Sequence, residues 1–139
     1  MYLLDTNIIS ELMKKEIDEA VENWFNQINL SDTRISDISM AELYRGYARL
    51  EEGKRKKSIL KNLQRIELDF QNQLLPFDTA SAKHYGDLSA RTEQQGLSMD
   101  AFDGLLLAVA ETHELTIVTR NSKHFENRTK RTIINPFER

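Results

Sequence analysis

The sequence predicts an α/β protein, a three-layer α/β/α sandwich with a short parallel sheet of four to five strands. Short apolar runs, several of them β-branched, alternate with longer segments whose apolar residues recur every three or four positions. Strands that alternate with helices in this way are typical of a parallel sheet covered on both sides. With 139 residues and 40% hydrophobic content, the chain fits one core, so we expect a single domain over residues 1–139.

The first strand and helix carry the first candidate site residue. The run at residues 2–4 predicts a buried strand that stops at Asp5, and residues 8–13 continue at helical spacing. Ligands bind at the carboxyl ends of strands in open α/β sheets, and a carboxylate flanked by Thr6 and Asn7 suits a hard cation. Alternatively, Asp5 closes a turn and Thr6 or Asn7 caps the helix.

Five further segments are predicted in the first two thirds of the chain. Helices are expected where one apolar face recurs, strands where short apolar or β-branched runs stand between turn residues. The predictions are a helix over residues 18–28, a short strand over 34–36, a helix that begins at Ser39 and is ended by Gly53, a helix over about 56–70, and a short strand over 74–77.

The last third of the chain shows the same patterns of apolar and turn residues. The predictions are a helix capped by Asp78 or Thr79 and stopped by Gly96, a nearly all-apolar helix from Ser98, a strand over 116–118, and a final strand over 132–134 before Pro136. A helix that is apolar nearly all round is expected to be buried.

Three acidic residues stand near predicted helix starts. Glu42 fits the pattern Ser-x-x-Glu from Ser39, so its structural alternative is a capping-box glutamate. Asp100 and Asp103, three residues apart, are expected to share one face of their helix, where favourable interaction with the helix dipole is the alternative. Gly104 inside that helix costs roughly 1 kcal/mol relative to Ala, which indicates close packing or room for a ligand, unless the chain turns there.

A fourth polar cluster, Thr119-Arg120-Asn121, follows the strand at residues 116–118. Its alternative is a turn in which Asn121 caps the short helix that holds Phe125. The structural alternatives do not explain why all four signals fall at one edge of one sheet. Carboxylates brought together there repel one another unless they are protonated or bind a cation, and oxygen ligands indicate Mg²⁺ or Mn²⁺.

Composition narrows the remaining classes. The absence of cysteine excludes disulfides and thiolate-metal sites, and fits a reducing cytoplasm. No apolar run is long enough to span a bilayer, so we expect a cytoplasmic protein without a membrane partner. The formal net charge of −3 gives no global attraction to nucleic acid, which would have to be held by local basic patches.

The motifs, taken in order, resemble those of the PIN-domain ribonucleases, and within them the VapC toxins of type II toxin-antitoxin systems. The resemblance covers nearly the whole chain. Its specific parts are Leu4-Asp5-Thr6-Asn7, Ser39-Met40-Ala41-Glu42-Leu43 with Gly46, Phe102-Asp103-Gly104-Leu105-Leu106-Leu107-Ala108, Val118-Thr119-Arg120-Asn121 with Phe125, and Ile134-Asn135-Pro136-Phe137.

The resemblance implies the roles of the site residues. Asp5, Glu42 and Asp103 would be the catalytic acids: Asp5 and Asp103 as direct metal ligands, and Glu42 as a ligand through water or the group that orients the nucleophile. Thr6, Asn7, Thr119 and Asn121 would support them. Many members carry Asp or Glu where this chain has His124, which puts a second metal ion in doubt; Asp100 is the residue that would compensate.

The implied activity is that of a metal-dependent endoribonuclease, a hydrolase in which a water activated by Mg²⁺ or Mn²⁺ attacks an RNA phosphodiester. By the same resemblance the protein would be a homodimer, neutralised by a VapB-like antitoxin through which alone it would contact DNA. Arg45, Arg49 and Arg120 are the cations we expect to hold RNA phosphates; a solvated charged face is their alternative.

Three other classes share parts of this pattern. A haloacid-dehalogenase-like phosphotransfer enzyme would use Asp5 as a covalent nucleophile, but it would need a second Asp where Asn7 stands. A receiver-like signalling domain would need a phosphorylatable Asp after a middle strand. A catalytically weak PIN-fold protein that mainly binds a partner is the third alternative, and His124 is the departure that favours it.

Overall fold

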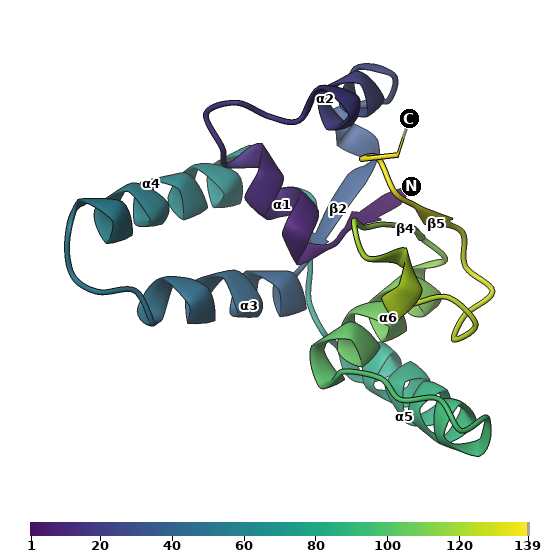
Figure 1. Cartoon of the computed structure of the whole chain (residues 1–139). Coiled ribbons are helices and arrows are strands. Elements are labelled where there is room, and N and C mark those ends of the chain that lie inside the picture. Colours follow the sequence, from purple (N-terminus) through teal and green to yellow (C-terminus); the bar gives the residue numbers. More distant parts are fainter. Residues whose placement is uncertain (139) are drawn as a thin grey trace.

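A five-stranded parallel sheet forms the centre of the molecule, as the computed structural model, which describes residues 1–138, shows (Figure 1). The strand order is β3-β2-β1-β4-β5, and every neighbouring pair is parallel. The strands are β1 (Tyr2–Leu4), β2 (Thr33–Ser36), β3 (Leu74–Leu75), β4 (Thr116–Val118) and β5 (Ile133–Ile134). The predicted fold class is therefore confirmed, with β1 as the central strand.

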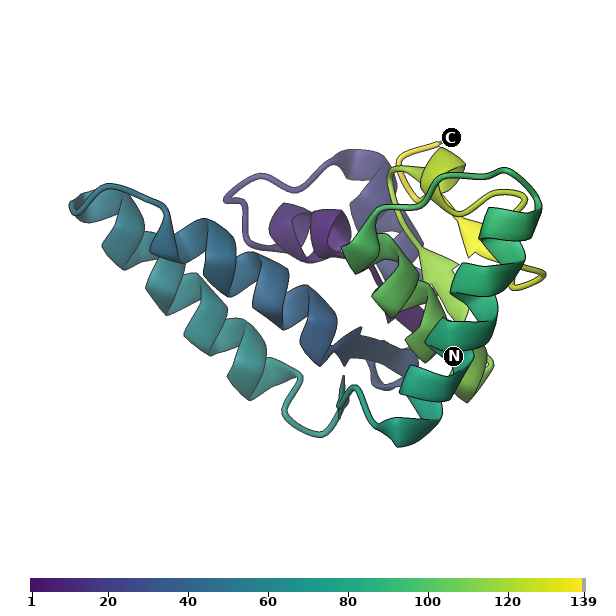
Figure 2. The same ribbon diagram turned by 90° about the horizontal axis from the view of Figure 1, so that it is seen from below.

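Helices connect successive strands. They are α1 (Thr6–Leu12), α2 (Glu19–Asn26), α3 (Asp37–Ala48), α4 (Lys54–Asp69), α5 (Thr79–Gln94) and α6 (Ala101–His113), with short 3-10 turns η1 (Leu30–Asp32) and η2 (Ser122–His124). Helices α3 and α4 form an antiparallel hairpin that projects from the sheet, whereas α5 and α6 lie together on its other side (Figures 1 and 2). None of the helices among residues 1–138 is long and apolar enough to cross a membrane.

The side chains of β1 and β4 alternate between two cores, as the period of two in a strand requires. Leu4 and Val118 belong to a core shared with α1, α3 and α4. Leu3 and Ile117, one residue earlier in each strand, belong to a second core formed with α5 and α6. These side chains are fully buried, so the sheet is covered on both faces, as expected for an all-parallel sheet.

Two predicted helix starts are wrong, by two or three residues. Helix α3 begins at Asp37 because Ser36, not Ser39, is its N-cap and accepts a hydrogen bond from the backbone of Ile38 at 3.0 Å. Helix α6 begins at Ala101 and not at Ser98, because Asp100 is the cap. The cap of α3 lies before the expected start, and the cap of α6 lies after it.

The other boundaries differ slightly from the predictions. The expected end of α3 at Gly53 is wrong: α3 ends at Ala48, and Gly53 is the N-cap of α4, which begins two residues early. Helix α5 runs on to Gln94, beyond its predicted apolar face. Asp78 is the cap of α5, one of the two residues expected there. The strand expected over 74–77 is only two residues long, since Pro76 has no N–H to continue the ladder.

The order of the strands determines where a ligand would bind. The chain adds β2 and β3 on one side of β1, then crosses to the other side to add β4 and β5. The strand order reverses between β1 and β4, so the connections after these two strands run in opposite directions and leave a crevice at their carboxyl ends. Asp5 follows β1 and Thr119 follows β4, so both lie at this crevice.

Candidate active site

A cavity of about 370 Å³ lies at the carboxyl ends of β1 and β4. Four acidic side chains reach it from three separate parts of the chain. Its lining comprises Asp5, Thr6, Asn7, Ser10, Glu42, Asp100, Asp103, Asn121 and His124. The structure thus brings together most of the predicted site residues; of the supporting four, only Thr119 is not part of the lining.

Asp5 is held in place by its neighbours. Its Oδ1 accepts a hydrogen bond from the backbone N–H of Thr6 at 2.7 Å, so Asp5 itself is the N-cap of α1, in place of Thr6 or Asn7. Its Oδ2 accepts from Thr119 Oγ1 at 2.8 Å and from Asn7 Nδ2 at 3.2 Å. Burial raises the pKa of the Asp5 carboxyl, and these hydrogen bonds oppose the rise. The result is a rigid carboxylate that is only 5% exposed.

Glu42 does not form the capping box, because the start of α3 at Asp37 places it in the second turn of the helix. Its Oε1 accepts a hydrogen bond from Thr6 Oγ1 at 2.7 Å, so the carboxylate faces the start of α1. Burial raises its pKa, and the charges of Asp5 and Asp100 raise it further. Glu42 therefore lies on the same side of the cavity as Asp5, within electrostatic reach of it.

Asp103 is the most strongly perturbed acid. It lies in the first turn of α6, 18% exposed, with Oδ2 at 3.1 Å from His124 Nδ1. Burial raises its pKa to about 6; the Asp5 carboxylate adds to this rise, and the charge of His124 opposes it. Burial is the main cause of this raised pKa, and the part contributed by Asp5 is what a cluster of like charges produces.

Asp100 and Gly104 flank Asp103. Asp100 caps α6 by accepting hydrogen bonds from the backbone N–H groups of Phe102 and Asp103 at 2.9 and 3.3 Å, so one of its oxygens is already used. Gly104 lies inside the helix, so the turn considered for it is wrong. A Cβ there would lie 3.1 Å from Tyr85 Cε1 and 3.3 Å from Met99 Sδ. Close helix packing explains this glycine.

The loop after β4 ties the site to the sheet. Asn121 N donates to Thr119 Oγ1 at 3.0 Å, and Arg120 N donates to Asn7 Oδ1 at 3.0 Å. The side chain of Asn121 makes no hydrogen bond that caps the short helix η2 within the described chain. Asn121 instead lines the cavity, as predicted, while Thr119 is fully buried behind Asp5.

The three arginines expected to hold RNA lie outside the lining of the cavity. Arg45 on α3 and Arg49, the C-cap of that helix, are exposed, one and two turns beyond Glu42. The guanidinium of Arg120 lies 4.5 Å from the centroid of the Phe137 ring, a cation–π contact. Their contact with RNA stays a prediction.

Two residues of the site were not predicted as ligands or supports. Ser10 follows Thr6 by one helical turn on α1, so the helical spacing alone could have indicated it. His124 contacts Asp103, which is on a helix far away in the sequence. Only the three-dimensional structure reveals this contact.

The donor groups fit a hard divalent cation by their chemistry, since carboxylate oxygens are the ligands that Mg²⁺ and Mn²⁺ prefer. Within residues 1–138, however, no three acidic or histidine side chains are spaced to hold one ion in their present orientation. Glu42 and Asp103 point instead to Thr6 and His124.

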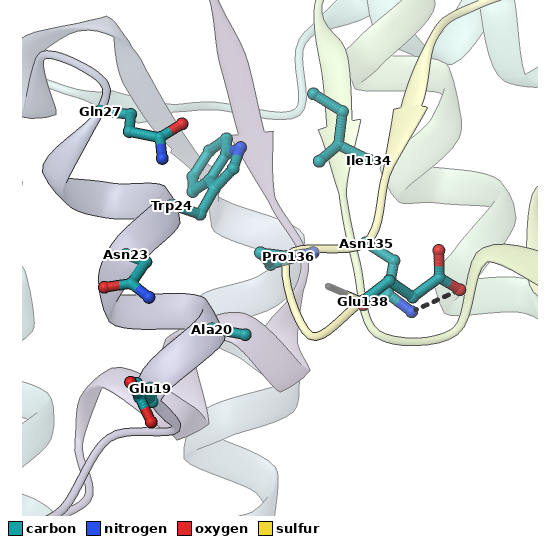
Figure 3. A pocket seen from close by; sticks show the side chains of 9 residues that line it. All are labelled: Glu19, Ala20, Asn23, Trp24, Gln27, Ile134, Asn135, Pro136 and Glu138. Carbon is teal, nitrogen blue, oxygen red and sulfur yellow. Dashed lines mark hydrogen bonds between the residues drawn. The ribbon is translucent and has the colours of Figure 1, made fainter.

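A second cavity, of about 470 Å³, lies between α2 and the C-terminal segment (Figure 3). Trp24 lines it from α2 and Gln27 from the residue that ends this helix, and Ile134 and Pro136 line it from the other side. Its carboxylates, Glu19 and Glu138, come from the two opposite sides. This cavity lacks the cluster of four acids that lines the site at the carboxyl ends of β1 and β4.

Comparison with known proteins finds relatives that match nearly the whole chain. Over 139 aligned residues the chain is 36% identical to the plasmid stability protein StbB of Pseudomonas syringae pv. tomato and to the VapC ribonuclease Y4jK of Sinorhizobium fredii, with 99% of each chain covered. It is also 36% identical to toxin FitB of Neisseria gonorrhoeae over 126 residues, which cover 90% of this chain and 91% of FitB.

The fold is also that of solved structures. FitAcB from Neisseria gonorrhoeae matches with a TM-score of 0.90 at 34% identity over 100% of both chains, and FitAB bound to the IR36 DNA fragment matches with 0.89 at 32%, over 100% of this chain and 97% of that one. The family model of the PIN domain matches residues 2–130, which include every acid of the cavity. The chain therefore belongs to the PIN domain family.

Proposed function

We propose that this protein is the toxin of a toxin-antitoxin module and acts as an endoribonuclease, cleaving RNA phosphodiester bonds. Whole-length relatives that are named as a VapC ribonuclease and as a toxin support this proposal. The observation that carries it is the convergence of Asp5, Glu42 and Asp103 on one cavity, at the point between β1 and β4 where the strand order of the sheet reverses. Residues 1–139 are proposed to act as one domain.

Each acid has a role that its surroundings support. Asp5 and Asp103 would hold Mg²⁺ or Mn²⁺ directly, with Asp5 kept in one orientation by Thr119 and Asn7. When bound, such an ion would supply an activated water and offset the charge that develops on the phosphoryl oxygens. Glu42 would orient that water or bind through it. Thr6, which donates to Glu42, would position this carboxylate, and Asn121 would support the opposite rim.

The partners follow from the same proposal. The neighbouring structure of FitAB contains DNA, which favours a module in which an antitoxin of the VapB kind contacts the DNA while it neutralises the toxin. We also propose that the protein is a homodimer in the cytoplasm, because of its resemblance to the VapC toxins. Asp100 is proposed as a further ligand only through its free oxygen, and Arg45, Arg49 and Arg120 as contacts for RNA phosphates.

The haloacid-dehalogenase-like alternative is not supported. The family match is to the PIN domain, and Asn7 donates to Asp5 where that class would need a second carboxylate. The same family match excludes the receiver-like alternative.

A cleavage assay on total RNA with Mg²⁺ or Mn²⁺ tests the function. Asp5→Asn and Asp103→Asn should each abolish cutting, because each removes a charged ligand. Asp87→Asn, which changes an exposed acid on α5, is the matched control and should cut like the wild type. Unchanged cutting by both site variants would contradict the proposal, while tight metal binding without any cutting would favour a catalytically weak binding protein.

A further inference from the structure

The imidazole of His124 reaches the same cavity as the acids. It lines that cavity with Asp5, Glu42 and Asp103, and its Nδ1 lies 3.1 Å from Asp103 Oδ2. The side chain is 54% exposed, so it is open to a ligand that enters from solvent. Among the described residues that line the cavity, His124 is therefore the one with a ring nitrogen that can bind a metal ion.

The backbone fixes this position. His124 N donates to Asn121 O at 3.0 Å in the short turn η2, and Asn121 N is tied to Thr119 Oγ1. The next residue, Phe125, is fully buried in the core formed with α5 and α6. An anchor on each side of His124 holds its Cα at the rim of the cavity, so only rotation about the side-chain bonds remains.

The distance between the two donor atoms fits a shared ion. Ligand atoms on adjacent corners of an octahedral shell lie about 3 Å apart when the ion-ligand distances are about 2.1 Å. Nδ1 of His124 and Oδ2 of Asp103 already have such a separation. The same pair also fits a direct hydrogen bond, so the experiment must distinguish a ligand from a group that only contacts Asp103.

We propose that His124 supplies a nitrogen ligand to the ion held by Asp103, and that this ligand makes the site select Mn²⁺ over Mg²⁺. The inference rests on the proposed function, since it concerns the metal of that same site. Mg²⁺ takes oxygen ligands and keeps its waters, whereas first-row transition ions accept imidazole. A neutral imidazole in place of a carboxylate also brings one negative charge less, a loss that a transition ion partly recovers through its bond to nitrogen.

Metal binding, measured without RNA, tests the inference. Electron paramagnetic resonance of free Mn²⁺ gives the Kd for Mn²⁺, and displacement of Mn²⁺ by Mg²⁺ gives the Kd for Mg²⁺. The Kd for Mg²⁺ divided by the Kd for Mn²⁺ measures the preference for Mn²⁺. This ratio should fall at least about tenfold in His124→Asp and in His124→Gln, the scale on which changes around a metal alter affinity. His84→Gln, at an exposed histidine of α5, should leave the ratio unchanged.

The other outcomes would contradict either the role of His124 alone or the proposed function as well. A ratio that is unchanged in both His124 variants, while Asp103→Asn weakens Mn²⁺ binding, overturns the role of His124 and leaves the proposed function standing. Mn²⁺ binding as tight in Asp103→Asn as in the wild type, or no binding by the wild type, overturns both. Melting curves in EDTA show that the variants are folded, and His124→Gln adds no charge that could destabilise the site.

Discussion

At the scale of single residues, the site keeps acidic side chains buried close together, and this lowers the free energy of unfolding of the protein. Asp5, Glu42 and Asp103 all have raised pKa values, chiefly because they are buried, and the charges of neighbouring acids add to the rise for Glu42 and Asp103. Only Asp5 is fully supported by hydrogen bonds from its neighbours. Clusters of this kind are typical of functional sites, because a protein without a ligand there gains nothing from keeping like charges together.

Replacement of Asp103 by Asn should therefore stabilise the protein in EDTA. The amide keeps the shape of the side chain and removes the repulsion from Asp5, so we expect the free energy of unfolding at pH 7.5 to rise by about 1–3 kcal/mol. Thermal unfolding of both proteins in EDTA measures this. A clear fall in the melting temperature would instead indicate that the carboxylate is needed for structure, through its contact with His124.

The pH dependence of stability should change in the same variant. The Asp103 carboxyl has a pKa of about 6 in the folded protein, well above that of an unperturbed aspartate, so the folded state binds more protons than the unfolded state between these two pKa values. Its contribution makes the protein more stable as the pH falls through 6 toward 4. In urea titrations with EDTA, the gain in stability from pH 7 to pH 5 should be smaller in Asp103→Asn than in Asp87→Asn. Equal gains would contradict the assignment of the raised pKa.

At the scale of helices and strands, the sequence predicted the type of every main element, because each helix has a recurring apolar face and each strand is a short apolar or β-branched run. It was less informative about their ends. Ser36 and Ser39 are both good caps, and only the packed position of α3 decides between them. The direction of the Glu42 side chain depends on that start, so its hydrogen bond to Thr6 was beyond prediction. The contact of His124 with Asp103 joins two elements with no local signal.

Gly104 makes a prediction about the packing of α6 against α5. Gly104→Ala gains roughly 1 kcal/mol of helix propensity, but its Cβ meets Tyr85 and Met99 at 3.1 and 3.3 Å. Overpacking costs about 1–3 kcal/mol, so we expect a net loss of stability of about 1 kcal/mol. Gly86→Ala, in the middle of α5 with open space around its Cβ, should gain stability instead. Chemical denaturation compares the two, and a gain in both would show that the contact at Gly104 relaxes easily.

Tyr44 makes a prediction about the α3–α4 hairpin that carries Glu42. Its hydroxyl donates to the Glu67 carboxylate on α4, a hydrogen bond that raises the pKa of Tyr44 to about 12. Tyr44→Phe should lower the free energy of unfolding by about 1 kcal/mol, since it removes the bond and keeps the ring. Tyr47→Phe is the control, because the Tyr47 ring still packs edge-on against Tyr44. An equal effect of the two changes in urea unfolding would argue against this tie between the helices.

At the scale of the whole molecule, the position of the site follows from topology. Strands β1 and β4 are neighbours in the sheet but not in the chain, and the reversal of strand order between them places Asp5 beside the loop after β4. Helices α3 and α6 then bring Glu42 and Asp103 to the same crevice. The parallel sheet was predictable from the alternation of strands and helices. Its strand order was not, because short strands carry no signal for their neighbours.

The central claim is that acids from distant parts of the chain meet around one divalent cation. Diffraction from crystals soaked in Mn²⁺ tests it most directly, since the anomalous signal locates the ion independently of the protein atoms. We expect one strong peak within bonding distance of the Asp5 and Asp103 carboxylates, with Glu42 turned toward it. A peak elsewhere, or none at saturating Mn²⁺ with the side chains of Asp5 and Asp103 directed apart, would contradict the account.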